Sequence, residues 1–394
     1  MATSSILIGR VGQAYAKKQA AWGTFEPLVA ANAFRHKALT FPGSDNKNYR
    51  LILEKKVSPF PTVGMQTAQR GTAGYNLSAL LRPSGTINTL PEVDPFLECA
   101  FGAKTNTVLA TTVASGSAVG GATLTSAAGL AVGGALLIVC PDAKKRVRFI
   151  TAVDTGTGVT TWAPNLPASQ NPAVGAAVKS GLTYKPTSQL LLFFTIAHYL
   201  KNLDATAALA RQIDSASVEK LTLAFDANDD PMLTLSGLGR YLDTPTAQAQ
   251  PAGFTMVGTQ PPSGLTGEFL IDNTATKFMK LSLDLNNALK VRADSYGQDK
   301  AEEVFRVGRP VISVGLDVRA ESETLYDLTE AGTNCGVFLQ TGFTEGNIIA
   351  VRLPSVSFTV PDTDDPDEEV NFPFKGEARE STDAALDIFS LALC

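Results

Sequence analysis

The chain has 394 residues, of which 44% are hydrophobic and 18% charged, so two or three domains are expected rather than one compact core. Short runs of Val, Thr, Leu and Phe between many Gly and Pro residues indicate a mainly β protein with many turns. Two His residues and four Cys residues without a CxxC spacing argue against a zinc site and favour buried free thiols at Cys99, Cys140, Cys335 and Cys394.

The net charge of −5 is unevenly distributed. Residues 1–255 hold 22 Lys+Arg and 15 Asp+Glu, whereas residues 256–394 hold 11 Lys+Arg and 23 Asp+Glu. This asymmetry suits a subunit whose basic part meets the acidic part of a neighbour. Two differently solvated halves of one chain would explain it equally well.

The first 48 residues are interpreted as an N-terminal arm, with Trp22 and Phe25 as its aromatic anchors. An arm of this length must lie on a surface to be ordered, and a neighbouring subunit is the expected surface. Residues 49–55 and 73–81 alternate apolar and polar side chains, which predicts two half-buried strands.

A short helix is predicted over residues 91–101, with Pro91 in its first turn and Gly102 as its stop signal. Val93, Phe96 and Leu97 would pack this helix and are candidate interface residues. Residues 104–182 differ in texture, being rich in Ala, Gly, Thr, Ser and Val. We interpret them as a small β-barrel-like module inserted into the first domain as an external decoration.

The module contains a basic cluster, residues 144–148, that could contact nucleic acid. A solvated strand–turn face is the favoured reading, because aromatic residues are not interleaved with the charges. After the module, residues 190–199 predict an apolar strand, while residues 205–213 fit either a helix or a turn between strands.

Alternating Leu residues predict a hairpin over residues 221–235, with its tip near Asp229, Asp230 and Pro231. Residues 246–263 are rich in Pro, Gln and Gly and are interpreted as a linker. The first domain would then comprise residues 49–103 and 183–245, and the second residues 264–394.

The second domain repeats the plan of the first without an insertion. Strands are predicted over residues 278–285 and 311–318, with residues 289–292 as the hairpin partner of the former. A second short helix over residues 323–331 would be packed by Leu325 and Leu328. A hairpin with the acidic tip Asp364, Asp365 and Pro366 echoes the Asp229–Asp230–Pro231 tip, which indicates two similar half-molecules.

No constellation of residues predicts catalysis or a cofactor. The stretch from Asp226 to Gly237 resembles a calcium loop, but Pro231 replaces the required Gly and the final carboxylate is missing. The acidic segment 362–369 could bind a cation, although solvation is the simpler reading. His198 has no nucleophile or carboxylate at motif spacing.

Several segments resemble the major tail tube proteins of long-tailed, non-contractile (siphovirus-like) bacteriophages. They are Trp22-Gly23-Thr24, residues 70–82, residues 90–97, residues 221–242, residues 281–287 and residues 326–332. The resemblance implies tandem β-sandwich or half-barrel domains, each with one flanking helix. It also implies stacked rings whose lumen holds the tape measure protein and then passes DNA during ejection.

If the family's ring holds six tube domains, a chain with two such domains would close it as a homotrimer with pseudo-sixfold symmetry. A homohexamer is the alternative. The resemblance further implies contacts with tail terminator and distal tail proteins at the ends of the tube, and a virion protein made in the host cytoplasm. Among the candidate interface residues, the two hairpin tips would meet neighbouring rings or face the lumen.

The rival reading is a surface or secreted carbohydrate-binding β-sandwich protein. Such a protein would expose aromatic platforms, yet the chain has only 2 Trp and 8 Tyr. Residues 1–13 lack the apolar core of a secretory signal, and the longest apolar run, residues 131–140, is about half of what crosses a bilayer. We therefore expect no membrane insertion by this chain.

Overall fold

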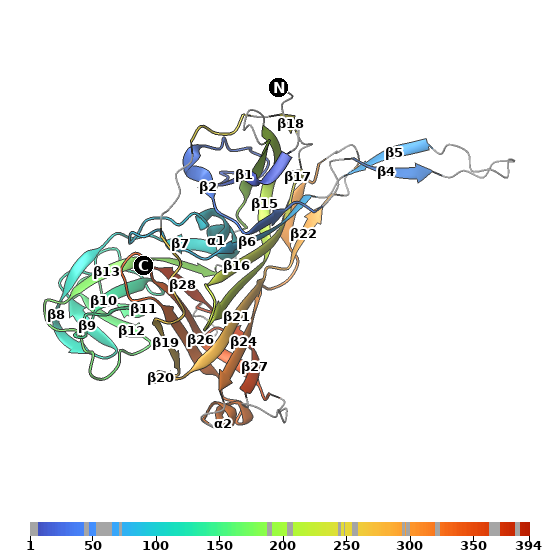
Figure 1. Ribbon diagram of the computed structural model, residues 1–394. Helices are drawn as coiled ribbons and strands as arrows, with labels where there is room; N and C mark the ends of the chain where they lie inside the picture. The colour runs from blue at the N-terminus through green and yellow to red at the C-terminus, as the bar shows by residue number, and fades with distance from the viewer. Residues whose placement is uncertain are drawn as a thin grey trace.

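The computed structural model is mainly β, as the sequence predicted, with strands running through both halves of the chain (Figure 1). It describes residues 7–42, 47–52, 65–70, 73–186, 191–202, 208–242, 246–247, 249–253, 259–293, 296, 300–319, 324–361, 371–382 and 387–394. The secondary structure falls into a first half, an inserted barrel and a second half.

The first half is built from antiparallel strands around one helix. Its longest strand, β15 (Ala208–Asp226), pairs with β14 (Phe194–Asn202) and with β16 (Met232–Gly239). The other elements are β1 (Leu7–Lys18), a 3-10 turn (Ala30–Asn32), β2 (Ala33–Phe34), β3 (Ala38–Thr40), β4 (Lys47–Ile52), β5 (Met65–Arg70), β6 (Ala73–Leu80), α1 (Asp94–Phe101), β7 (Gly102–Thr105), β17 (Tyr241–Leu242) and β18 (Thr246–Ala247).

The inserted segment is a closed barrel of antiparallel strands, seen at the left of Figure 1. Each of its strands pairs with two others, in the closed order β8–β9–β12–β11–β10–β13–β8. Its strands are β8 (Ala110–Ala118), β9 (Gly121–Leu124), β10 (Ala135–Val139), β11 (Lys145–Val153), β12 (Val159–Ala163) and β13 (Ala177–Pro186). The last of these continues out of the barrel to pair with β7 and β28.

The second half repeats the element order of the first. Its strands are β19 (Gly267–Ile271), β20 (Thr274–Ala275), β21 (Phe278–Asn286), β22 (Leu289–Arg292), β23 (Glu303–Arg306), β24 (Val311–Arg319), β25 (Cys335–Thr341), β26 (Ile349–Thr359), β27 (Asn371–Arg379) and β28 (Ser390–Leu393), with helix α2 (Thr324–Glu330) between β24 and β25.

Strand pairing shows that the repeat is topological as well as sequential. In the first half β1 pairs with β14, β14 with β15, β15 with β16, β16 with β6 and β6 with β3. In the second half β19, β25, β26, β27, β24 and β21 make the same series of pairs. Each half also has a separate hairpin at the equivalent place in the chain. It is β4–β5, between β3 and β6, in the first half and β22–β23, between β21 and β24, in the second.

Three local predictions differ from the structure. Residues 208–213 are neither helix nor turn but the start of β15, because pairing with β14 outweighs their helical propensity. Residues 289–292 pair with β23 instead of with β21, whose two edges are taken by β15 and β24. Within the expected arm, residues 7–18 form β1, which pairs with β14 of the same chain.

Helix α1 sits at the centre of the first half's core. It begins at Asp94, three residues later than predicted, with Pro95 in its first turn. Gly102 ends it in the left-handed conformation that glycine adopts without strain. The fully buried ring of Phe96 packs edge-on against Phe34 and Phe194, with ring centroids 5.0 Å apart in both cases.

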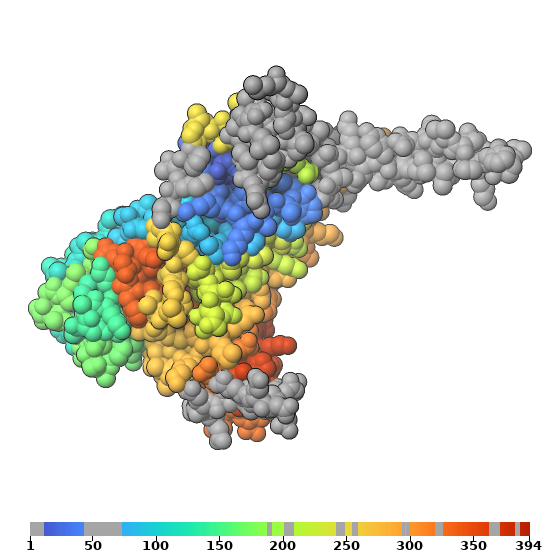
Figure 2. Space-filling model, viewed as in Figure 1, coloured from blue at the N-terminus to red at the C-terminus, as the bar shows by residue number. Residues whose placement is uncertain are grey.

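The barrel is seated on the second half through an apolar contact. Figure 2 shows the barrel surface, in teal and green, directly against orange segments of the second half. Buried side chains of β10 and β11 pack against those of β25, β26 and the C-terminal strand; the contributing residues include Leu137, Phe149, Phe338, Ala350 and Ala392. The Gln340 side chain adds polar contacts, accepting from Val147 N at 2.8 Å and donating to Lys145 O at 2.9 Å.

A buried ion network crosses the same contact and corrects the reading of the basic cluster. Arg148 is fully buried, with its guanidinium 2.5 Å from a Glu268 carboxylate oxygen and over the Phe338 ring. Arg146 is also buried and pairs with Asp142 at 2.8 Å and with Glu268 at 3.3 Å. The cluster is therefore not a solvated strand–turn face, since two of its arginines form ion pairs inside the protein.

Candidate assembly interface

The two halves of the chain join edge to edge through strand pairing. The C-terminal part of β15 pairs along one edge with β16 and along the other with β21, from Lys220↔Asn286 to Asp226↔Lys280. Phe225, Leu223 and Leu221 of β15 and their partners on β21 are buried in the common core. The chain thus contains one complete joint between two repeats.

The same two edges recur at the outer ends of the chain. The strand equivalent to β15 is β26, whose pairing with β25 ends at Val356. Beyond that residue, β27 is its one strand partner in the described part of the chain. The strand equivalent to β21 is β3, and among the described residues it pairs only with β6. Each end therefore presents half of a joint.

Exposure agrees with open edges at both places. Val360, which follows β26, is 47% exposed, and Thr359 is also exposed. On β3, Ala38 and Thr40 are exposed while Leu39 is half-buried against the core. Open edges of this kind attract another strand unless a partner covers them.

The internal joint places an acidic turn beside basic side chains. The β15–β16 turn lies on a cavity of about 600 Å³ that opens between the two halves. Asp226 and Asp229 line it together with Lys277, Lys280 and Arg319. Of the tip residues named from the sequence, Asp229 and Asp230 are exposed and Pro231 is buried. This tip therefore lies against the second half of its own chain.

Three other candidate interface residues belong to the chain's own core. Val93, Phe96 and Leu97 are at most 4% exposed and pack in the main core cluster. A side chain that is buried before assembly can support an interface only indirectly. The apolar pattern was read correctly as packing, but the sequence does not distinguish the core of a subunit from a contact between subunits.

The two aromatic anchors of the N-terminal segment differ in how far they are buried. Trp22 is half-buried against Phe193, with ring centroids 4.8 Å apart, so it fastens the segment to its own chain. Gly23 follows with a positive φ of 78°, and its N–H donates to Ser215 Oγ at 2.8 Å. Phe25 is 45% exposed and is available for a contact outside the chain.

The remaining candidates lie at the far end of the second half. Leu328 on α2 is half-buried and packs against the main core. Leu325 is on the same helix, and its side chain is outside the described residues, as are Asp364, Asp365 and Pro366.

The two histidines, far apart in the sequence, meet inside the first half. Their rings, His36 and His198, pack edge to face with centroids 5.3 Å apart. Burial, together with the charge of His36, lowers the pKa of His198 from 6.5 to about 4. Burial also lowers the pKa of His36. Both rings are thus held in the neutral form in the folded chain.

This pair makes folding stability depend on pH. Because the folded pKa of His198 lies below the unfolded value of 6.5, its contribution is complete above pH 6.5 and is lost as pH falls toward about 4. After allowance for partial exposure we expect this loss to be about 1–2 kcal/mol. The change His198→Gln should flatten the dependence of the urea midpoint on pH in this window. An equally steep dependence in the variant would assign the effect to carboxylates instead.

In the described part of the chain, Cys, His, Asp and Glu residues do not gather in any group of three that could hold a metal ion. The four cysteines are free and buried. None of the helices among the described residues has the length and apolar character that spanning a membrane requires.

The comparison with known proteins concerns the two halves of the chain and the barrel between them. A family model described as phage tail tube protein matches residues 9–376. The match runs through both halves and the barrel between them, and includes both open edges. The curated proteins gave no match.

Proposed function

Because the chain belongs to the phage tail tube protein family, we propose that it is the major tail tube subunit, a structural rather than catalytic protein, and that its copies close head to tail into rings. The rings stack into the conduit for DNA ejection. The observation that carries this proposal is the joint between β15 and β21, whose two edges recur on β26 and β3 without a further strand partner among the described residues.

Such an interface is heterologous, since the edge of β26 on one copy meets the edge of β3 on the next. Contacts of this type form a closed ring when the rotation per subunit divides a full turn, and ring closure leaves no edge open. If the ring of the family holds six tube domains, three chains complete it with pseudo-sixfold symmetry. The repeated topology of the two halves supports three chains over six.

The remaining parts of the chain take places around this ring. The two halves on either side of the barrel serve as the two tube domains. The first includes β1 and β3 from the segment expected to be an arm, together with residues 49–103 and 183–245, and the second comprises residues 264–394. The barrel faces outward, and the excess of carboxylates in the second half keeps DNA phosphates from adhering to the lumen. Tape measure protein and DNA occupy the lumen in turn, and terminator and distal tail proteins cap the ends of the tube in the virion.

Ring mass tests the proposal with the purified full-length chain. We expect particles of three times the 41.5 kDa chain mass by mass photometry, and rings or tubes by negative-stain microscopy. Rings of six chains would overturn the trimer while keeping the tube. A chain that stays monomeric at high concentration, under conditions where its β signal is intact, would contradict the assembly itself.

A further inference from the structure

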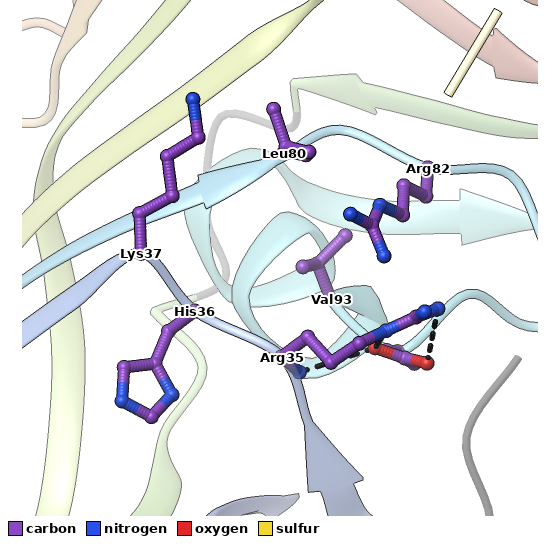
Figure 3. A pocket seen from close by; sticks show the side chains of 7 residues that line it. Arg35, His36, Lys37, Leu80, Arg82 and Val93 are labelled. Carbon is purple, nitrogen blue, oxygen red and sulfur yellow. Dashed lines mark hydrogen bonds and ion pairs between the residues drawn. The ribbon is translucent and has the colours of Figure 1, made fainter. Parts of the chain in front are cut away.

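A small basic cavity lies beside the open edge of β3 (Figure 3). It measures about 60 Å³ and is formed by the segment before β3, the end of β6 and the approach to α1. The lining residues are Arg35, His36, Lys37, Leu80, Arg82, Glu92 and Val93.

More cationic than carboxylate side chains line this cavity. Arg35 is paired with Glu92 through three hydrogen bonds: its guanidinium donates two, 2.9 and 3.1 Å long, and its backbone N–H donates one of 3.1 Å. Lys37 is exposed, and the buried Nε of Arg82 has no hydrogen-bond partner among the described residues. Burial and the charge of Arg35 lower the pKa of Arg82, against the opposing effect of Glu92 and Asp230. Arg82 and Lys37 therefore have charge to offer to an incoming anion.

The cavity occupies the same place in the first half as the basic side of the internal joint does in the second. Lys277 immediately precedes β21, Lys280 is its third residue, and Arg319 ends β24. Arg35 and Lys37 precede β3, and Arg82 follows β6, the strands equivalent to β21 and β24. In the internal joint, this position faces the acidic turn that follows β15. At the proposed contact between two copies, the cavity faces the segment that follows β26 of the adjacent copy.

The segment that follows β26 is the most acidic in the sequence. Residues 362–369 contain six carboxylates and no basic residue: Asp362, Asp364, Asp365, Asp367, Glu368 and Glu369. We propose that this segment of one copy docks in the basic cavity beside β3 of the next copy and selects the head-to-tail contact. The inference rests on the proposed ring and adds the electrostatic element that directs its closure.

Charge pairing at this place would act mainly on the rate and direction of association. Complementary patches raise association rates and suppress wrong contacts, here tip against tip or edge against like edge. Exposed charges are screened within about 8 Å at physiological salt, so the effect should fall as salt rises. Strand pairing would then hold the ring once it has formed.

A charge-reversal series tests the docking. The double variant Lys37→Glu, Arg82→Glu should slow ring formation at low salt by roughly tenfold or more, as steered association allows. The variant Asp364→Lys, Asp365→Lys should do the same. Mixing these two variants should restore pairwise association between unlike copies, because each supplies the charge that the other lacks. A ring of three cannot alternate the two variants, so its closure should stay slow. Ring formation is followed by light scattering and mass photometry.

The controls separate docking from folding and from the ring itself. Lys144→Glu reverses one charge, half the change of the double variant, at an exposed turn of the barrel and should assemble like the parent chain. Circular dichroism and the urea midpoint report whether each variant is folded. Failure of the unaltered chain to form rings would count against the proposed function. Rings that form at the parent rate in both reversal variants would overturn the docking alone. So would variants that assemble normally but lose retention on DNA-cellulose, which would make the cavity a nucleic-acid contact.

Discussion

A chain that carries Thr40→Cys and Thr363→Cys is expected to become covalently closed on oxidation, in species of up to three chains and no more. Thr40 is exposed on the open edge of β3, and position 363 lies four residues after the end of β26 in the sequence. In the proposed ring these positions belong to adjacent copies. Non-reducing electrophoresis gives the number of linked chains and thereby the number of subunits in the ring.

The first position of this pair follows from equivalent strand registers. Leu39 of β3 lies opposite Leu77 of β6, as Leu281 of β21 lies opposite Leu316 of β24. These two reference strands are aligned by their contacts with glycines, since Tyr75 faces Gly237 and Val314 faces Gly376. Thr40 is therefore the counterpart of Ser282.

The second position follows from the hairpin partners. In the internal joint Ser282 faces Ala224, and Ala224 in turn faces Met232, the first residue of β16. Its counterpart is Asn371, the first residue of β27. If the register Thr359↔Lys375 is extended by four residues in the assembled ring, position 363 comes opposite Asn371. Position 363 of one copy is thus expected opposite Thr40 of the next.

A slipped pair provides the matched control for the cross-link. Thr40→Cys with Asp364→Cys shifts the register by one residue and turns one thiol to the opposite face of the sheet, so it should not link. The native cysteines are buried and should not form disulfides under these conditions. Linked species that continue to six chains would establish the hexamer. Equal linking of both pairs would show that the edges do not meet in the expected register.

Local patterns predicted much of each half because both the strands and the turns have local causes. Alternation over residues 73–81 predicted β6, on which Tyr75, Leu77 and Ala79 are buried. Gly102 was read correctly as the end of the first helix because a left-handed cap favours glycine. The hairpin over residues 221–235 was also confirmed by its register.

Features that depend on distant residues could not be read in the same way. Arg148 is buried because Glu268, far along the chain, meets it across the barrel contact. Residues 208–213 become a strand because β14 offers them an edge. The echo of the two Asp-Asp-Pro tips suggested aligning Phe225 with Val360, whereas the strand registers align Leu221 with Val360. The Asp-Asp-Pro motif therefore begins eight residues after Leu221 in the first half but four residues after Val360 in the second, which only the paired strands reveal.

The change Glu268→Gln is expected to lower the free energy of unfolding by about 3–5 kcal/mol, because it removes the partner of a buried charge. Arg148 is fully buried and Glu268 is its paired carboxylate, 2.5 Å away. Burial already lowers the pKa of Arg148, and the charge of Glu268 opposes that shift. Gln keeps the shape of the side chain but not its charge. Urea denaturation of the full-length chain measures the loss.

Glu345→Gln is the matched control on the same face. Its carboxylate pairs with Lys145 at 2.8 Å and Lys179 at 2.6 Å, and the lysine side chains are 31% and 37% exposed. Exposed pairs contribute about 0–1 kcal/mol, so this change should hardly move the midpoint. Similar losses in both variants would show that the Glu268 pair is not electrostatically special.

A further variant separates stability from positioning of the barrel. Arg148→Met with Glu268→Leu removes both charges, and Arg146 keeps its two hydrogen bonds to Asp142, each 2.8 Å long. Replacing a buried pair by apolar residues is often neutral or stabilising by about 1–4 kcal/mol. We therefore expect the double variant to unfold near or above the parent midpoint. If it does, yet assembles less regularly, the ion pair serves to fix how the barrel sits on the second half. A double variant as unstable as Glu268→Gln would instead make the pair a net source of stability.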